Sequence, residues 1–296
     1  MHKIFEILNI PMLMEPDRFA GFLHGYRMLR SVTVKAEDRA TRAVNVEGAA
    51  LQLTMNSGYA VAPGGIAIIG VFGPMFKGYG AYGYADQSEL RGAVRGAAND
   101  PSVNGIMLLI DSPGGSVAGT ADLAAEIRSA DAVKPVVAYI EDCGCSAAYW
   151  TAASARAIYS NGGMVGSIGV VTAIVDSSKY FEAAGIKVIP IVTGEMKAVG
   201  MEGQPVTAAQ VEYVQGMIDA IYADFLSAVS TSRGMRADTI RKMEARVYVG
   251  QQAVENKLID GVMSFDKAYS ALSKMAKQTG ANKRAKAMNM LAEMEG

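Results

Sequence analysis

Histidine is nearly missing from this chain: His2 and His24 are the only two among its 296 residues. A catalytic Ser-His-Asp triad would therefore need a histidine from the extreme N-terminal part, which makes that triad improbable. Cysteine is as scarce, and Cys143 and Cys145 are too close in sequence for a comfortable disulfide. These counts exclude a disulfide scaffold, favour reduced thiols, and leave too few ligands for a metal site. No metal or cofactor is expected.

An excess of one charge and a long apolar run are lacking as well. The formal net charge is −1, so the composition does not indicate nucleic-acid binding. The most apolar stretch, residues 64–76, contains Gly70, Gly73 and Pro74 and is shorter than the roughly 18 residues of a membrane span. Residues 1–9 show no signal-peptide pattern. We therefore expect a soluble, cytoplasmic protein without a membrane anchor.

What the chain does have is a regular alternation of apolar strands and helices. Hydrophobic residues make up 50% of it and charged residues 19%, so a large core can form. The patterns predict strands at 66–71, 105–110, 135–140, 169–175, 187–192 and 247–250, and helices at 86–99, 119–129, 146–154, 179–184, 207–232 and 251–256. The order favours an α/β fold with a parallel β-sheet core and flanking helices.

The expected organisation is an N-terminal arm at 1–62, a main domain at 63–278 and a flexible C-terminal tail at 279–296. The apolar stripe of the helix at 207–232 is expected to pack into the core.

A glycine turn follows the second predicted strand, in the sequence Asp-Ser-Pro-Gly-Gly-Ser-Val at 111–117. An ordinary turn would explain Gly114 and Gly115. However, the carboxyl end of a strand that leads into a helix is where α/β sheets place ligand sites. Because no phosphate-loop pattern follows, the functional hypothesis is an oxyanion site that uses the Gly114 amide.

Ser146 stands at the start of the third predicted helix, between small residues. A helix cap is a good explanation for a serine there. As a nucleophile it would have room beside it for a substrate carbonyl, and the Ala147 amide would be a second oxyanion donor.

A nucleophilic serine needs a base, and lysine is the remaining candidate when histidine is missing. Composition alone does not separate Lys197 from Lys179 or Lys187.

Four motifs occur in the order and spacing of the signal peptide peptidase A (protease IV) family. They are residues 111–115, 144–149, 165–170 and 193–197, and the segment 246–261 also looks like that family's C-terminal portion. The chain resembles this family over about residues 65–272. The resemblance implies a serine peptidase domain at 63–278, with the fold shared by the Clp proteolytic subunit and the crotonases.

The same resemblance implies a Ser/Lys dyad with defined roles for six residues. These are Ser146 as nucleophile, Lys197 as general base, Gly114 and Ala147 as oxyanion donors, Ser167 as the residue that orients the lysine, and Gly115 in support. The family often has Ala-Ser-Gly-Gly around the nucleophile, whereas residues 145–148 read Cys-Ser-Ala-Ala. Cys145 is therefore an alternative nucleophile, although the motif register favours Ser146.

The N-terminal arm, with Met-Glu-Pro-Asp-Arg-Phe at 14–19, resembles that of phage head-maturation proteases of the minor capsid protein C type. This implies a homo-oligomer that cleaves scaffold or capsid protein, and also itself, in a prohead inside the bacterial host cytoplasm. A soluble housekeeping peptidase for short peptides and a crotonase-like acyl-CoA enzyme are the alternatives. The sequence leaves open whether residues 1–62 are a targeting arm or a pro-segment.

Overall fold

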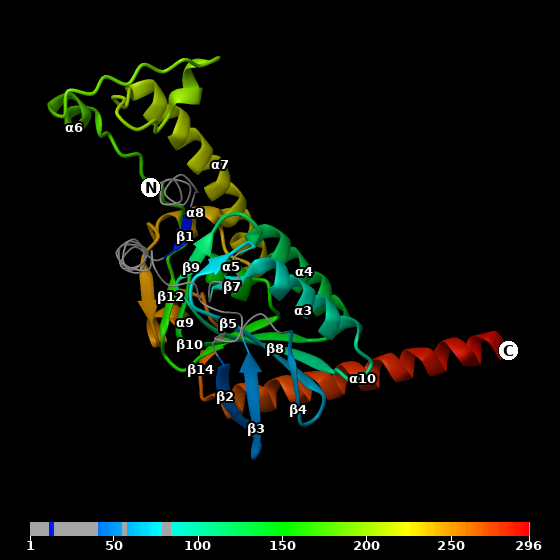
Figure 1. Ribbon diagram of the computed structural model, residues 1–296. Coiled ribbons are helices and arrows are strands. Elements are labelled where there is room, and N and C mark those ends of the chain that lie inside the picture. Colours follow the sequence, from blue (N-terminus) through cyan, green and yellow to red (C-terminus); the bar gives the residue numbers. More distant parts are fainter. Residues whose placement is uncertain (1–11, 15–40, 55–57, 79–83, 296) are drawn as a thin grey trace.

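The computed structural model describes residues 12–14, 41–54, 58–78 and 84–295, and a mainly parallel β-sheet lies at its centre (Figure 1). Within these residues the sheet contains β4 (Ala60–Ala62), β5 (Ile66–Phe72), β8 (Gly105–Ser112), β10 (Val136–Cys145), β11 (Ala157–Ser160), β12 (Met164–Gly166), β13 (Val247–Val249) and β14 (Gly261–Val262). Strands β5, β8 and β10 are neighbours and run parallel, as do β10 and β12. Strands β4 and β13 pair antiparallel with β5 and β12. The expected α/β class with a parallel core is confirmed.

Both faces of the sheet are covered. The helices α3 (Gln87–Asn99), α4 (Thr120–Val133) and α5 (Ala147–Ala153) pack on one face, and α10 (Phe265–Glu295) packs on the other. Alternate residues of β8 point to opposite faces of the sheet. Ile106 and Leu108 belong to the hydrophobic cluster on the α3, α4 and α5 side, and Met107 and Leu109 belong to the cluster on the α10 side. A strand buried on both faces is apolar throughout, which is why its sequence shows no polar alternation.

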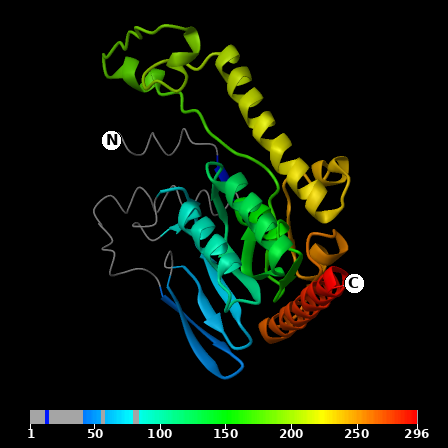
Figure 2. The same cartoon turned by 90° about the vertical axis from the view of Figure 1, so that its right-hand side faces the viewer.

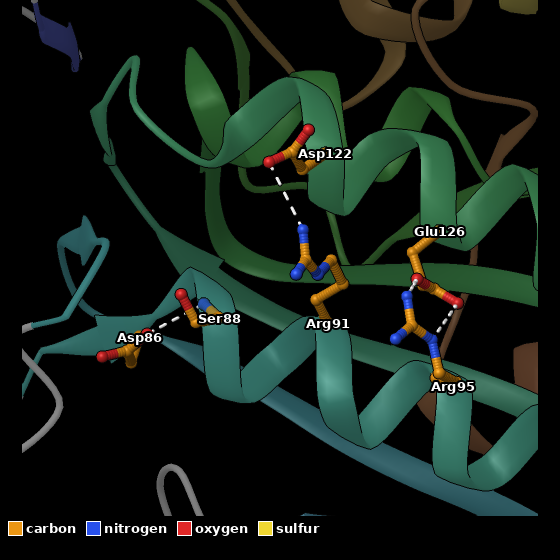
Figure 3. A network of polar contacts seen from close by, with 6 residues as sticks. All are labelled: Asp86, Ser88, Arg91, Arg95, Asp122 and Glu126. Atoms are coloured by element: carbon orange, nitrogen blue, oxygen red, sulfur yellow. Dashed lines mark hydrogen bonds and ion pairs between the residues drawn. The ribbon is translucent and has the colours of Figure 1, made fainter.

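Ion pairs connect α3 and α4 on their outer surface (Figure 3). Arg91 lies 3.3 Å from Asp122, and the Arg95 guanidinium meets Glu126 through two nitrogens. The Asp86 carboxylate caps α3 by accepting from the Ser88 amide at 2.8 Å. Exposed pairs of this kind add little stability each, but together they fix how the two helices lie side by side.

A smaller four-stranded sheet stands at the carboxyl end of the central strands. Its strand order is β1 (Met12–Met14), β9 (Gly114–Ser116), β6 (Met75–Phe76) and β7 (Ala85–Asp86). Strand β9 approaches β6 so closely that a Cβ on Gly115 would lie 1.8 Å from the carbonyl oxygen of Met75. Only glycine fits at position 115, so the glycine turn is a requirement of strand packing.

A projection rises from the body of the molecule between β12 and α8 (Ala237–Arg241). It carries α6 (Ser178–Ala183), the short 3-10 helix η4 (Glu195–Ala198) and the first part of α7 (Ala208–Arg233), and it stands away from the sheet in both views (Figures 1 and 2). The far end of α7 is anchored in the body, where Phe225 stacks on Trp150 of α5 at 4.8 Å between ring centroids.

Two predictions for this part of the chain are wrong. Residues 169–175 and 187–192 were expected to be strands, but the described structure has no strand there apart from an isolated bridge at Val171. An apolar β-branched run becomes a strand only beside a partner strand, and these runs lie on the projection, where Ile191 is 96% exposed. The apolar stripe of α7 is buried only toward its end, at Phe225, Leu226 and Val229. In its first part Val211 and Met217 are exposed, and Val214 and Ile218 are half-buried.

The ends of the chain add two elements that the sequence did not indicate. Within the expected arm, β2 (Thr41–Val46) and β3 (Ala49–Thr54) form a hairpin that docks on the α10 side of the sheet, with Arg42 2.7 Å from Glu141. In the expected tail, residues 279–295 continue α10. The domain boundaries themselves stay predictions. Residues 1–11, 15–40 and 55–57 of the expected arm lie outside the described residues.

Candidate active site

Ser146 occupies a sharp turn between β10 and α5, the helix that begins at Ala147. Its backbone has φ 57° and ψ −120°, a combination that is strained for any residue other than glycine. The turn is held by its own backbone, because the Ser146 N–H donates to the Gly166 carbonyl at 2.8 Å and its carbonyl accepts from the Trp150 amide at 2.9 Å. The side chain makes no capping hydrogen bond to α5, so helix capping does not explain this serine.

The Ser146 hydroxyl is buried and, among the described residues, its Oγ has no hydrogen-bond partner. A buried polar atom left unpaired costs about 1–3 kcal/mol, and native structures hold few of them. A strained strand-to-helix turn that presents an unpaired hydroxyl is the arrangement of a nucleophile elbow.

The expected oxyanion donors come from two neighbouring turns. Gly114 begins β9 with φ 97°, a conformation that glycine adopts without strain. Gly144 of β10 pairs with Ser112 of β8, so both turns leave the sheet at the same edge. Ala147 is the first residue of α5, where an N–H has no acceptor within its own helix. The Gly114 N–H donates to the Ser112 Oγ at 3.2 Å, so in this structure it is already engaged.

Ser167 follows β12 and lies next to the Ser146 turn. Its neighbour Gly166 pairs with Cys145 and accepts the Ser146 N–H, which brings the two serines together. Ser167 is buried, has a positive φ of 52°, and donates its N–H to the Arg246 carbonyl at 3.0 Å. Cys145 is also buried, on β10 directly before the turn.

The structure does not bring Lys197 to this cluster. Lys197 belongs to η4 and is exposed, whereas Ser146 directly precedes α5. The chain between α6 and α7, which includes η4, stands on the projection, and α5 lies in the body (Figures 1 and 2). Lys179 and Lys187 are exposed on the same projection. Within one copy of the chain, the turns that carry Gly114, Ser146 and Ser167 therefore lie together, and the expected base lies apart from them.

Two polar residues that the sequence reasoning missed support the site. Ser112 receives the Gly114 amide, as described above. Gln87, buried in the first turn of α3, donates through Nε2 to the Ser116 carbonyl at 3.1 Å and to the Thr120 Oγ1 at 2.8 Å. Gln87 thereby fixes the end of β9. A glutamine in an amphipathic helix gives no sequence signal for such a role.

The helix behind Ser146 is fixed from the other side by Tyr149. This buried phenol donates to the Leu258 carbonyl at 2.9 Å. Burial raises the pKa of Tyr149 well above its usual range, so the hydroxyl stays protonated and keeps its role as donor. Nearby, Arg233 at the end of α7 pairs with Asp260 at 2.9 Å. Helix α5 and the base of the projection are thus tied to the same segment.

Comparison with known proteins places these motifs in a family. The model of peptidase family S49 matches residues 128–279, a range that includes Ser146, Ser167 and Lys197. The chain belongs to peptidase family S49. This confirms the resemblance to the signal peptide peptidase A family.

Relatives include phage and cellular proteins. The chain is 31% identical to the head-tail preconnector protein GP5 of Enterobacteria phage P21 over 78% of its length, covering 46% of that protein. It is 33% identical to the capsid assembly protease C of Escherichia phage lambda over 60% of its length, covering 40% of that protein. It is 29% identical to Protease 4 of Salmonella typhi over 72% of its length, covering 35% of that protein. The chain spans less than half the length of these three relatives.

Among solved structures, a ClpP1 mutant from Listeria monocytogenes aligns with 68% of this chain and 93% of its own, at a TM-score of 0.45 and 10% identity. That likeness is too low to bear on function. Among the helices of the described residues, none combines the length and the hydrophobicity of a membrane span. The described residues also contain no group of three or more His, Cys, Asp or Glu placed to hold a metal ion.

The unpaired hydroxyl leads to a stability prediction. Replacing Ser146 by alanine removes a buried atom that has no partner, so the free energy of unfolding should stay the same or rise by up to about 1 kcal/mol. The matched control is Ser160→Ala, because the Ser160 Oγ is equally buried but accepts from the amides of Gly162 and Gly163. Its loss should lower the free energy of unfolding by about 1–2 kcal/mol. Denaturant unfolding of both variants measures this, and an equal loss in both would contradict it.

Proposed function

We propose that this protein is a serine peptidase in which the Ser146 hydroxyl is the nucleophile and Lys197 is the general base. The observation that carries the proposal is the buried, unpartnered Ser146 Oγ at a strained strand-to-helix turn. Membership of peptidase family S49 supports it, and so does the lack of any histidine after residue 24.

In the proposed reaction the uncharged Lys197 Nζ accepts the Ser146 proton while Oγ bonds to the carbonyl carbon of the peptide. The resulting oxyanion accepts from the amides of Gly114 and Ala147, for which Gly114 exchanges Ser112 as its acceptor. The lysine ammonium then protonates the leaving amine as the C–N bond breaks. Water, deprotonated by the same lysine, hydrolyses the acyl-serine ester. Ser167 orients the lysine from its place beside Ser146.

The exposed position of Lys197 requires one further element, which we propose to be a second copy of the chain. A lysine serves as a base only where its surroundings favour the uncharged amine, and an exposed loop does not provide this. The projection also carries large apolar side chains in solvent, with Tyr180 75%, Ile189 70% and Ile191 96% exposed. Isolated chains seldom expose so much apolar surface in one place.

A groove of about 350 Å³ adds to this exposed surface. Its wall is formed on one side by Val170, Val171, Thr172 and Ile174, and on the other by residues of α7, among them Val211, Val214, Gln215 and Ile218. If the projection packs against a neighbouring copy, the apolar groups become buried and Lys197 reaches the Ser146 turn of that neighbour. The active protein would then be a homo-oligomer.

Mixing two inactive variants tests this arrangement. Ser146→Ala and Lys197→Ala should each lack activity alone, measured as release of fluorescence from labelled casein, whereas Lys179→Ala on the same projection should stay active. When the two inactive variants are co-expressed with different tags and purified together, random assembly gives about a quarter of the sites an intact serine and an intact lysine from different copies. Activity near that level is expected.

Two results would contradict the proposal at different points. If Lys197→Ala alone is fully active, Lys197 is not the base. If the co-purified variants stay inactive although both are present in one assembly, the serine and the lysine of a site come from the same copy.

For the substrate, we propose the scaffold or capsid proteins of a phage, cleaved in a prohead in the bacterial cytoplasm. The support is that GP5 of phage P21 and capsid protease C of phage lambda are 31% and 33% identical to this chain. A housekeeping peptidase is the second candidate, on the strength of the 29% identity to Protease 4 of Salmonella typhi. An acyl-CoA activity finds no support in the comparisons.

Co-expression with phage scaffold and capsid proteins, taken from the genes next to this one where these encode them, tests the choice of substrate. Mass spectrometry should find shortened scaffold or capsid protein with the wild-type chain and intact proteins with Ser146→Ala. If both proteins stay intact while the wild type still cleaves casein, the proposal of phage substrates is contradicted and the housekeeping peptidase is favoured.

A further inference from the structure

The strand β9 has two edges, and they have different neighbours. One edge faces β6, where Met75 pairs with Gly115. The other edge pairs antiparallel with β1, in the register Met14 to Gly114, Leu13 to Gly115 and Met12 to Ser116 (Figure 1). Residues 12–14 therefore lie along the strand that carries the Gly114 amide.

That edge is where a peptide must lie if the proposed function is right, and the inference rests on that function. A scissile carbonyl has to reach both the Ser146 Oγ and the Gly114 N–H. An extended peptide can do so while keeping its backbone hydrogen-bonded by adding a strand to β9. Since β6 closes one edge of β9, the edge that β1 occupies is the one left for a peptide.

The direction of β1 fits this use. Running antiparallel to β9, the chain passes Ser116 first and reaches Gly114 with Met14. It therefore approaches the oxyanion side with its carboxyl end, as the part of a substrate before the scissile bond does. The pairing uses backbone groups alone, so it does not depend on particular side chains, but it does need backbone N–H groups, which proline lacks.

We propose that residues 12–14 are an internal occupant of the peptide-binding edge of β9, and that a substrate strand binds only when this segment has left. The N-terminal arm then acts as a pro-segment, which is one of the two roles that the sequence leaves open. Occupancy also raises the peptide concentration that is needed for binding, because an incoming peptide must compete with a segment tethered to the same chain.

The test is a binding measurement that does not depend on catalysis. All variants carry Ser146→Ala, and the probe is a fluorescein-labelled peptide with the sequence of residues 8–18, followed by fluorescence anisotropy. In one variant Leu13→Pro and Met14→Pro remove the backbone N–H groups of two successive residues. Along an antiparallel strand only every second residue donates its N–H to a given partner strand, so replacing two successive residues removes the donor that points toward β9. The matched control is Leu13→Ala with Met14→Ala, which changes the same side chains and keeps both amides.

The proline pair should bind the probe at least about tenfold more tightly than the alanine pair, as expected when a site occupied roughly nine-tenths of the time is released. A Leu13→Gly/Met14→Gly pair weakens the strand without fixing φ and should shift Kd in the same direction by less. Circular dichroism confirms that each variant is folded. Equal Kd values for the proline, glycine and alanine pairs would overturn the inference. Because the probe is never cleaved, this result is independent of whether Ser146 is the nucleophile.

Discussion

The contact between the backbones of β9 and β6 is the constraint on which the site depends. A side chain at position 115 would run into the Met75 carbonyl, so the strand that carries Gly114 can reach its place only through a glycine. Gln87 then holds the other end of that strand through the Ser116 carbonyl. The parallel pairing of β8 and β10 sets the Ser146 turn beside it. The proposed oxyanion donors and the nucleophile are thus positioned by main-chain packing, which is more rigid than contacts between long side chains.

Several energetically unfavourable features lie close together around the Ser146 turn. Ser146 and Ser167 both adopt positive φ, and the Ser146 hydroxyl is buried without a partner among the described residues. Such strain persists only where the surroundings enforce it. Here the enforcing elements are the Gly166 and Arg246 carbonyls and the Tyr149 hydroxyl bond behind α5. A fold that keeps a reactive hydroxyl unsatisfied gives up some stability for the chemistry we propose.

The sequence predicted the parts of the fold that depend on local pattern. The runs at 66–71, 105–110 and 135–140 are strands because both of their faces are buried, and the serine turn was found because small residues surround it. The prediction of strands at 169–175 and 187–192 was wrong because a strand also needs a partner strand, and none lies beside these residues in the described structure. The stripe of α7 did not reveal that only its last part, at Phe225, Leu226 and Val229, would be buried among the described residues. Strand β1 was not foreseen, since three residues paired through the backbone leave no pattern. For the site, the residue pattern pointed to Gly114, Ser146 and Ala147, and the family resemblance added Ser167. Neither indicated that Lys197 stands on a projection.

Covalent labelling of the nucleophile tests the central claim most directly. A β-lactone acylates an activated serine by ring opening, so its whole mass stays on the residue that attacks. Peptide mapping should place the added mass on Ser146 in the wild type, with no label in Ser146→Ala. Labelling should slow by at least about a hundredfold in Lys197→Ala, the size typical of a lost general base, while Lys179→Ala labels at the wild-type rate. A label on Cys145, or unchanged labelling without Lys197, would contradict the account.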